Sequence, residues 1–113
     1  MKIKSHIWIE KEGSTFIGSG RVALLKAIQE TGSMNKAAKS MNMSYKKAWT
    51  LIKSMDEMGP KPVVDKVIGG KGGGGAKLTD YGIQVVEAYN QLNKRCWEFL
   101  AKEEDKLLKE MGL

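Results

Sequence analysis

The side chains best suited to chemistry lie in the middle of the chain, where hydroxyl, phenol and ammonium groups follow one another. Ser44-Tyr45-Lys46-Lys47 opens a segment of helical pattern, and Lys71 and Lys77 accompany a run of glycines. Ammonium groups pair with phosphates, and hydroxyl and phenol groups hydrogen bond to phosphates or to base edges. The chemistry that this set indicates is therefore the binding of an anionic partner.

The rest of the reactive inventory is thin. The chain holds one His and one Cys, whereas a Cys/His zinc site needs about four ligands. A single Cys also forms no disulfide within the chain. No nucleophile stands beside a general base, so we expect no catalytic residue, no metal and no cofactor, and the protein is not expected to be an enzyme.

The charge distribution favours nucleic acid as the partner. The 113 residues carry 19 Lys and Arg against 13 Asp and Glu, a net charge of +6. Residues 33–77 hold nine Lys and three acidic residues, which also gives +6, while residues 98–113 hold three Lys and five acidic residues, or −2. A basic middle and an acidic end suggest a binding face and a separate assembly element, although a charged run is often only a solvated surface.

No apolar run approaches the roughly 18–20 residues that span a bilayer. The amino-terminal segment Met1–His6 has no apolar stretch behind its charges, so no secretory signal is expected. We therefore expect a cytoplasmic protein without a membrane partner. Its length is that of one domain.

The elements that must position these groups follow from periodicity and from capping residues. Residues 3–9 alternate apolar and polar residues, which predicts a strand with Ile3, Ser5, Ile7 and Ile9 on one side. A turn at residues 11–14 comes next. Three helices are then predicted at residues 20–31, 34 to about 41, and 45 to about 58. Gly32 is expected to end the first, and Ser33 and Ser44 to cap the other two.

A hairpin and a long helix complete the chain. Residues 63–68 and 76–79 are predicted strands on either side of the glycine run, and the last helix is predicted from Thr79 or Asp80 to about residue 111. The predicted order is strand, three helices, hairpin and long helix, without an internal repeat or a domain boundary.

The second and third helices, joined by a tight turn, form a candidate helix-turn-helix, whose second helix lies in the major groove of DNA. The alternative is that any three-helix domain holds two adjacent helices with a turn. The residues predicted to meet bases and phosphates are Ser33, Asn35, Lys36, Ser44, Tyr45, Lys46, Lys47, Thr50 and Lys53. Trp49 is expected to be a packing residue of the third helix.

Three interpretations compete for the glycine run at residues 69–75, in which six of seven residues are glycine. It is a flexible linker, a phosphate-binding P-loop, or the wing of a winged helix. A P-loop places Ser or Thr after its Lys, whereas Lys71 is followed by Gly72. The wing is the favoured interpretation, because glycines let backbone N–H groups approach phosphates closely. Its predicted contact residues are Lys71, Gly72, Gly73 and Lys77.

The last helix carries apolar residues at steps of four, three, four and three, the spacing of a heptad seam. Its residues are Val85, Tyr89, Leu92, Cys96 and Phe99. A soluble monomer seldom exposes such a stripe, so we predict a homodimer that forms through these helices. Cys96 is expected to act as a small apolar group of the seam.

Two stretches resemble the amino-terminal domain of the ModE molybdate-responsive regulators. They are residues 33–49, from SMNKAA to SYKKAW, and residues 69–82, GGKGGGGAKLTDYG. The resemblance covers roughly residues 18–95 and extends more distantly to the LysR-type regulators. It implies a winged helix-turn-helix that dimerises through its terminal helices and binds operator DNA. Full-length members also carry carboxy-terminal molybdate-binding modules, and this chain ends near where those would begin, so molybdate sensing is not carried over.

The predicted fold is mainly α with a small β component, a winged helix-turn-helix with a long carboxy-terminal dimerisation helix. Residues 1–113 form one domain, with a DNA-binding core and wing at about 20–82 and the dimerisation helix at about 80–111. The predicted function is that of a homodimeric transcriptional regulator bound to double-stranded DNA. A separate effector-sensing protein is a further possible partner. The alternative is a basic adaptor that binds a protein partner or an effector ligand without operator DNA.

Overall fold

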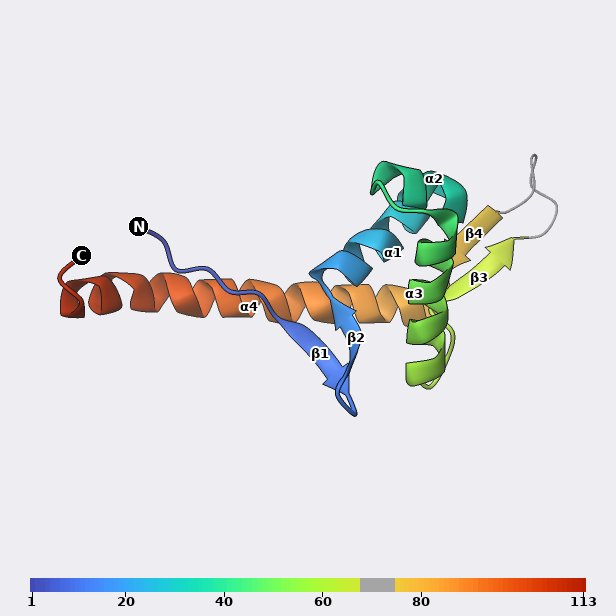
Figure 1. Cartoon of the computed structure of the whole chain (residues 1–113). Coiled ribbons are helices and arrows are strands. Elements are labelled where there is room, and N and C mark those ends of the chain that lie inside the picture. The colour runs from blue at the N-terminus through green and yellow to red at the C-terminus, as the bar shows by residue number, and fades with distance from the viewer. Residues whose placement is uncertain (68–74) are drawn as a thin grey trace.

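Three short helices and two β-hairpins gather around one end of a single long helix (Figure 1). The computed structural model describes residues 1–67 and 75–113. Its helices are α1 (Ser19–Thr31), α2 (Met34–Ser40), α3 (Tyr45–Met58) and α4 (Asp80–Glu110). Its strands are β1 (Trp8–Lys11), β2 (Ser14–Gly18), β3 (Val64–Val67) and β4 (Gly75–Leu78). Each hairpin is an antiparallel pair of consecutive strands.

The amino-terminal hairpin corrects the sequence prediction. The strand predicted at residues 3–9 begins only at Trp8, and its partner β2 was not predicted. The turn between them is confirmed, with Glu12 and Gly13 at φ of 53° and 81°. Ile9, which was predicted on the covered side, is 42% exposed, and the strand register shifts between Ile9 and Glu10.

Residues 3–7 are extended but lie against α4 and pair with no described strand. Their alternating pattern therefore predicted a strand where the chain forms none. Ile3, Ser5 and Ile7 are half-buried while their neighbours are exposed. The Ile3 backbone N–H donates to Glu104 Oε2 at 3.3 Å. The Tyr89 hydroxyl donates to the Ile7 carbonyl at 3.0 Å. A segment that packs on a helix shows the same two-residue alternation as one that packs on a sheet.

The predicted helix ends are confirmed by their capping contacts. Ser33 Oγ accepts from the Lys36 N–H at 3.2 Å, and Ser44 Oγ accepts from the Lys47 N–H at 3.1 Å. Gly32 ends α1 in the left-handed region, at φ 68°. These contacts satisfy backbone groups that the first and last turns of a helix leave unpaired.

The core lies between α1, α2, α3, the hairpin strands and the first half of α4. Its members include Ile17, Leu24, Leu25, Ile28, Ala48, Met55 and Val63, each at most 1% exposed. At the start of α4 the packing is so close that a Cβ on Gly82 would collide with the Val63 carbonyl. Glycine at this position therefore lets α4 approach the beginning of β3.

The second hairpin is anchored on the turn between α1 and α2. Val64 pairs with Leu78 and Val67 with Gly75. Gly75 also pairs with Ser33, and the Ala76 N–H donates to the Gly32 carbonyl at 2.9 Å. Both strands of the predicted hairpin are confirmed, and the predicted glycine tip lies outside the described residues.

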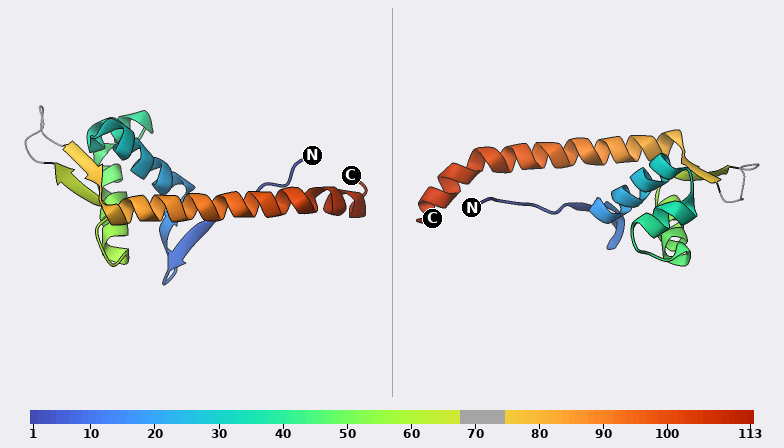
Figure 2. Two further views of the ribbon diagram at one scale, coloured as in Figure 1. Left: turned by 180° about the vertical axis from the view of Figure 1, so that it is seen from behind. Right: turned by 90° about the horizontal axis from the view of Figure 1, so that it is seen from above.

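Most of α4 extends beyond the core, and the amino-terminal segment runs beside it (Figure 2). The molecule measures 60 × 28 × 22 Å along its principal axes. Within residues 1–67 and 75–113, no helix has both the length and the apolar character needed to cross a bilayer.

Candidate nucleic-acid interface

The turn between α2 and α3 presents the first residues of α3 at the surface. Asn42 takes a left-handed conformation, at φ 54°, and the Met43 N–H donates to the Ala38 carbonyl at 3.0 Å. Ala48, Ile52 and Met55 bury the inner face of α3. The predicted contact residues of α3 are brought together on its exposed side: Ser44, Tyr45, Lys46, Lys47, Thr50 and Lys53.

The hydroxyl groups of Ser44 and Thr50, at the start of α3, make different hydrogen bonds. Ser44 Oγ accepts a hydrogen bond as the helix cap, so its own proton remains available for a phosphate or a base. Thr50 Oγ1 donates to the Lys46 carbonyl at 2.9 Å, so it offers an acceptor and a methyl group to a partner. Lys46 and Lys47 are both exposed and supply the charge.

The first turn of α2 lies next to the root of the second hairpin. Asn35 and Lys36 are exposed there, and Ser33 is half-buried. Ser33 caps α2 with its side chain and pairs with Gly75 through its backbone. The helix-turn-helix and the hairpin therefore form one continuous surface.

Of the predicted wing residues, the structure describes Lys77 alone. Lys77 is exposed on β4, directly across from Asp65 on β3. An opposite charge at a cross-strand position offsets part of the positive charge that Lys77 offers to DNA. Lys71, Gly72 and Gly73 lie outside the described residues.

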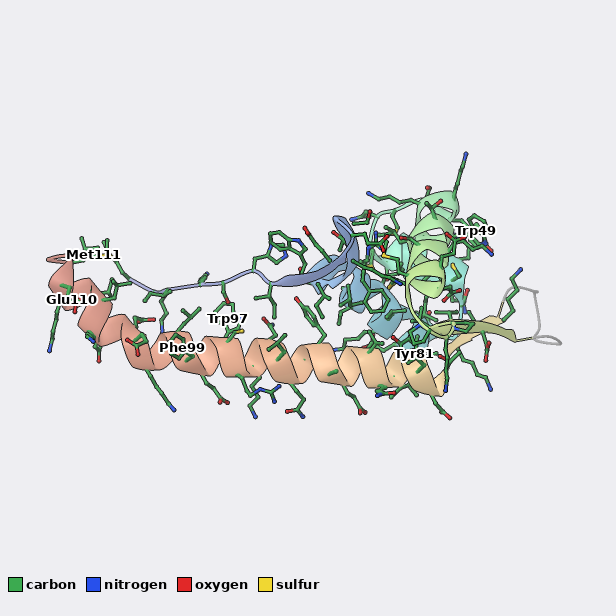
Figure 3. All side chains as sticks on the ribbon, turned by 90° about the horizontal axis from the view of Figure 1, so that it is seen from below. Trp49, Tyr81, Trp97, Phe99, Glu110 and Met111 are labelled. Carbon is green, nitrogen blue, oxygen red and sulfur yellow. The ribbon has the colours of Figure 1, made fainter. Side chains whose placement is uncertain are left out.

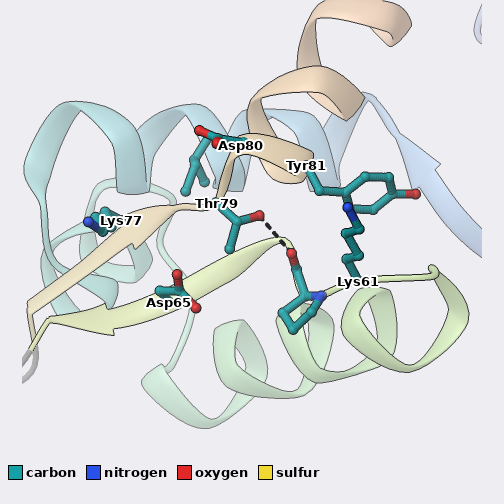
Figure 4. A pocket seen from close by; sticks show the side chains of 8 residues that line it. Lys61, Asp65, Lys77, Thr79, Asp80 and Tyr81 are labelled. Carbon is teal, nitrogen blue, oxygen red and sulfur yellow. Dashed lines mark hydrogen bonds between the residues drawn. The ribbon is translucent and has the colours of Figure 1, made fainter.

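A cavity of about 500 Å³ opens beside this hairpin, where β4 leads into α4 (Figure 4). Its charged lining residues are Lys61, Asp65, Lys77 and Asp80, two of each sign. Thr79 Oγ1 donates to the Pro62 carbonyl at 2.6 Å and accepts from the Gly82 N–H at 2.9 Å. The charges of the lining cancel and the Thr79 hydroxyl is already hydrogen bonded, so this cavity does not favour an anion. Its residues connect the second hairpin to the start of α4.

The expectation that Trp49 is a packing residue of the third helix is wrong. Trp49 is 43% exposed, and Lys53 Nζ lies 5.8 Å from the centroid of its ring. The apolar stripe of α3 already indicated this, since Ala48, Ile52 and Met55 follow helical spacing and position 49 falls off it.

The predicted seam of α4 divides into two parts. Tyr89 is 4% exposed inside the chain's own core, where burial raises the pKa of its phenol, and Val85 packs partly against that core. Leu92 and Phe99 are 39% and 62% exposed. Figure 3 shows Phe99 and Trp97 on the part of α4 that extends past the core. Tyr89 is therefore not available to a partner in this structure.

Asp56 and Arg21, two polar residues near the interface, stabilise the fold through hydrogen bonds. Asp56 Oδ1 accepts from the Val63 N–H at 2.7 Å. Burial raises the pKa of the Asp56 carboxyl, against the opposing effects of that N–H and of the Lys53 ammonium. The Arg21 guanidinium, whose pKa is lowered by burial, donates to Ser54 Oγ at 3.1 Å. Both side chains hold α3 in place.

The lysines of the central part of the chain face solvent. Of the nine Lys in residues 33–77, all except Lys71 are described, and each of these is exposed. Among residues 1–67 and 75–113, no three His, Cys, Asp or Glu side chains come together as a metal site would require. The arrangement suits an extended polyanion.

Several known proteins are similar to this chain in sequence. No protein-family profile matches it. The Molybdenum transport protein ModE of Azotobacter vinelandii is 43% identical over 84 residues, which are 74% of this chain and 31% of that protein. The Transcriptional regulator ModE of Haemophilus influenzae is 41% identical over 86 residues, 76% of this chain and 34% of that protein. The chain is a homologue of the ModE regulators. The DNA-binding transcriptional dual regulator ModE of Escherichia coli K12 is 32% identical over 107 residues, 92% of this chain.

The chain spans about a third of the length of these relatives, from 31% to 41%. Solved structures show its fold. The full-length LysR-type regulator LysG of Corynebacterium glutamicum matches 79% of this chain and 29% of that chain, with a TM-score of 0.56 and 19% identity. A MepR mutant from a Staphylococcus aureus clinical isolate matches 97% of this chain and 82% of that chain, with a TM-score of 0.57 and 21% identity. The predicted winged-helix fold, mainly α with a small β component, is confirmed.

Proposed function

We propose that this chain binds double-stranded DNA as a homodimeric transcriptional regulator. The observation that carries the proposal is the exposed, basic first turn of α3, held by the α2–α3 turn as the second helix of a helix-turn-helix. Relatives that are named transcriptional regulators support it. The proposed location is the cytoplasm of a bacterial or archaeal cell, where the DNA lies, and an enzymatic activity is not part of the proposal.

The contacts follow from the geometry of the interface. The first turns of α3 enter the major groove, where Ser44, Tyr45, Lys46 and Lys47 meet bases and flanking phosphates. Thr50 and Lys53 extend this surface along the same helix. The first turn of α2 contributes the phosphate contacts of Ser33, Asn35 and Lys36. Lys77 and, by extension of the sequence argument, Lys71, Gly72 and Gly73 serve the wing.

A dimer is proposed because α4 carries exposed apolar side chains beyond the core. Leu92 and Phe99 are exposed and Cys96 is half-buried on this part of the helix. Two recognition helices about 34 Å apart contact successive turns of the major groove. The proposed division is a DNA-binding unit at about 20–82 and a dimerisation helix at about 80–111.

The names of some relatives refer to molybdenum transport. The response to molybdate is not part of this proposal, because the matched part is a minority of each relative. The proposal allows a separate effector-sensing protein as a partner.

The decisive experiment is a gel shift with genomic fragments in the presence of excess random DNA. The expected result is retention of specific fragments by the wild-type chain and weaker retention by a Lys46→Ala/Lys47→Ala variant. A Lys102→Ala/Lys106→Ala variant is the matched control, since both residues are exposed on the distal part of α4. A wild-type chain that shifts no fragment at low salt would instead favour the protein-binding or ligand-binding adaptor.

A further inference from the structure

We propose that Trp49 is a specificity-determining residue, which recognises thymine by packing against its C5-methyl group. This inference rests on the proposed function and deepens it, because it assigns a base to a named side chain. Its basis is the exposure of Trp49 and the chemistry of the cleft beside it.

Trp49 lies on the flank of α3 that faces the second hairpin. At 100° per residue it falls one turn after Tyr45, between the outer side of the helix at Lys53 and the buried Ile52. Figure 3 shows its side chain at the end of the molecule that carries the hairpins, far from Trp97 and Phe99 on α4. A helix that lies in the major groove with its first turns therefore brings this indole close to the edges of the bases.

A cleft of about 190 Å³ opens beside the indole, between α3, the start of α2 and β3. We call it the Trp49 cleft. Its apolar walls are Trp49, Met34, Ile52 and Val64, and its polar residues are Lys53, Asp56 and Lys66. The two Lys are exposed and Asp56 is half-buried.

The lining of the cleft selects among the groups of DNA. The Asp56 carboxylate repels phosphate oxygens, and its Oδ1 is already bonded to the Val63 N–H. Apolar walls favour a methyl group, and the C5-methyl of thymine is the apolar group that base pairs present in the major groove. The Lys53 ammonium above the indole holds the ring, and together with Lys66 it can pair with the phosphates on either side.

The test uses the full chain and an operator fragment from the gel-shift experiment. Each thymine of one half-site is replaced in turn by deoxyuridine, which removes the methyl group alone. The expected result is a loss of affinity of about fourfold at one thymine, the factor that corresponds to burial of one methyl group. In Trp49→Ala this thymine and deoxyuridine should bind equally well, while the salt dependence of binding stays at the wild-type value.

Controls separate this inference from a folding defect and from the proposed function. Trp8→Ala removes an indole that is 52% exposed on β1, away from the interface, and should keep the discrimination. Thermal unfolding shows whether Trp49→Ala is folded. If it folds poorly, Trp49→Phe replaces it in the test, because it retains an apolar ring and should keep part of the discrimination between thymine and deoxyuridine.

Two results overturn the inference alone: a wild-type protein that binds DNA but tolerates deoxyuridine everywhere, or a Trp49→Ala variant that discriminates as before. A uniform loss of affinity together with a smaller salt dependence would show a phosphate contact and also overturn it. Absence of any DNA binding by the wild-type chain refutes the proposed function, and this inference with it.

Discussion

The salt dependence of DNA binding tests the interface at the two lysines that open α3. Lys46 and Lys47 are both exposed in the first turn of the helix, behind the Ser44 cap. If each neutralises one phosphate, its removal lowers the slope of log affinity against log salt by about 0.9. A dimer carries two copies of each residue, so Lys46→Ala/Lys47→Ala should lower the slope by about 3.6.

The size of the effect follows from this slope. Between 50 and 200 mM salt the logarithm of the concentration changes by about 0.6, so each phosphate contact accounts for a loss of about 3.5-fold in affinity. Four contacts together account for about 150-fold. Over this range the wild-type affinity should therefore fall about 150-fold further than that of the double variant.

Fluorescence anisotropy of a labelled operator duplex, titrated at several salt concentrations, measures this difference directly. Lys102→Ala/Lys106→Ala changes the net charge equally but places the loss in the acidic end of α4, so its slope should stay at the wild-type value. Parallel slopes for the wild type and for Lys46→Ala/Lys47→Ala would show that these lysines do not touch phosphates. An equal change in the control would show that total charge, and not the interface, determines the slope.

Three further predictions concern the fold and the assembly. Gly82→Ala should lower the free energy of unfolding by about 1–3 kcal/mol in denaturant melts, because its Cβ collides with the Val63 carbonyl; Gly20→Ala, with open space at that position, should not. Asp56 has a folded-state pKa above its ordinary 3.8, so its protonation favours the folded state, and this contribution is present below pH 3.8 and is lost as pH rises through the folded-state pKa. Thermal unfolding from pH 3 to 6 should show wild type losing stability relative to Asp56→Asn, which keeps an acceptor for Val63. Leu92→Asp should give monomers near 12.5 kDa by light scattering and weaken operator binding, whereas an unchanged dimer would place the interface elsewhere.

The helix-turn-helix could be predicted from the sequence because local chemistry determines it. Ser33 and Ser44 cap helices through bonds three residues away, and Gly32 ends α1 with a conformation that favours glycine. The buried face of α3 follows from helical spacing alone. None of these features depends on which distant segment completes the packing.

The features that the sequence did not reveal depend on tertiary partners. The two-residue alternation of residues 3–7 shows that one side is covered, and it does not say whether a strand or α4 covers it. Tyr89 fits a heptad seam equally well whether its neighbour is a second chain or Ile7 of its own chain. Trp49 shows the reverse case, since an apolar side chain stays exposed where α3 leaves its flank open to solvent.

The burial of Tyr89 also constrains where a dimer axis can cross α4. The large apolar residues of α4 that remain exposed begin at Leu92, and at 1.5 Å per residue Leu92 lies about 18 Å from Asp80 at the start of the helix. Two recognition helices one turn of DNA apart, about 34 Å, each lie about 17 Å from a two-fold axis. The Gly59 cap at the end of α3 lies against Tyr81 at the start of α4. An axis near Leu92 therefore gives the required separation, whereas Phe99, about 28 Å along the helix, lies too far away. Leu92→Asp should accordingly weaken dimers more than Phe99→Asp, although Phe99 is the more exposed of the two, and the opposite order in light scattering would exclude an axis at Leu92.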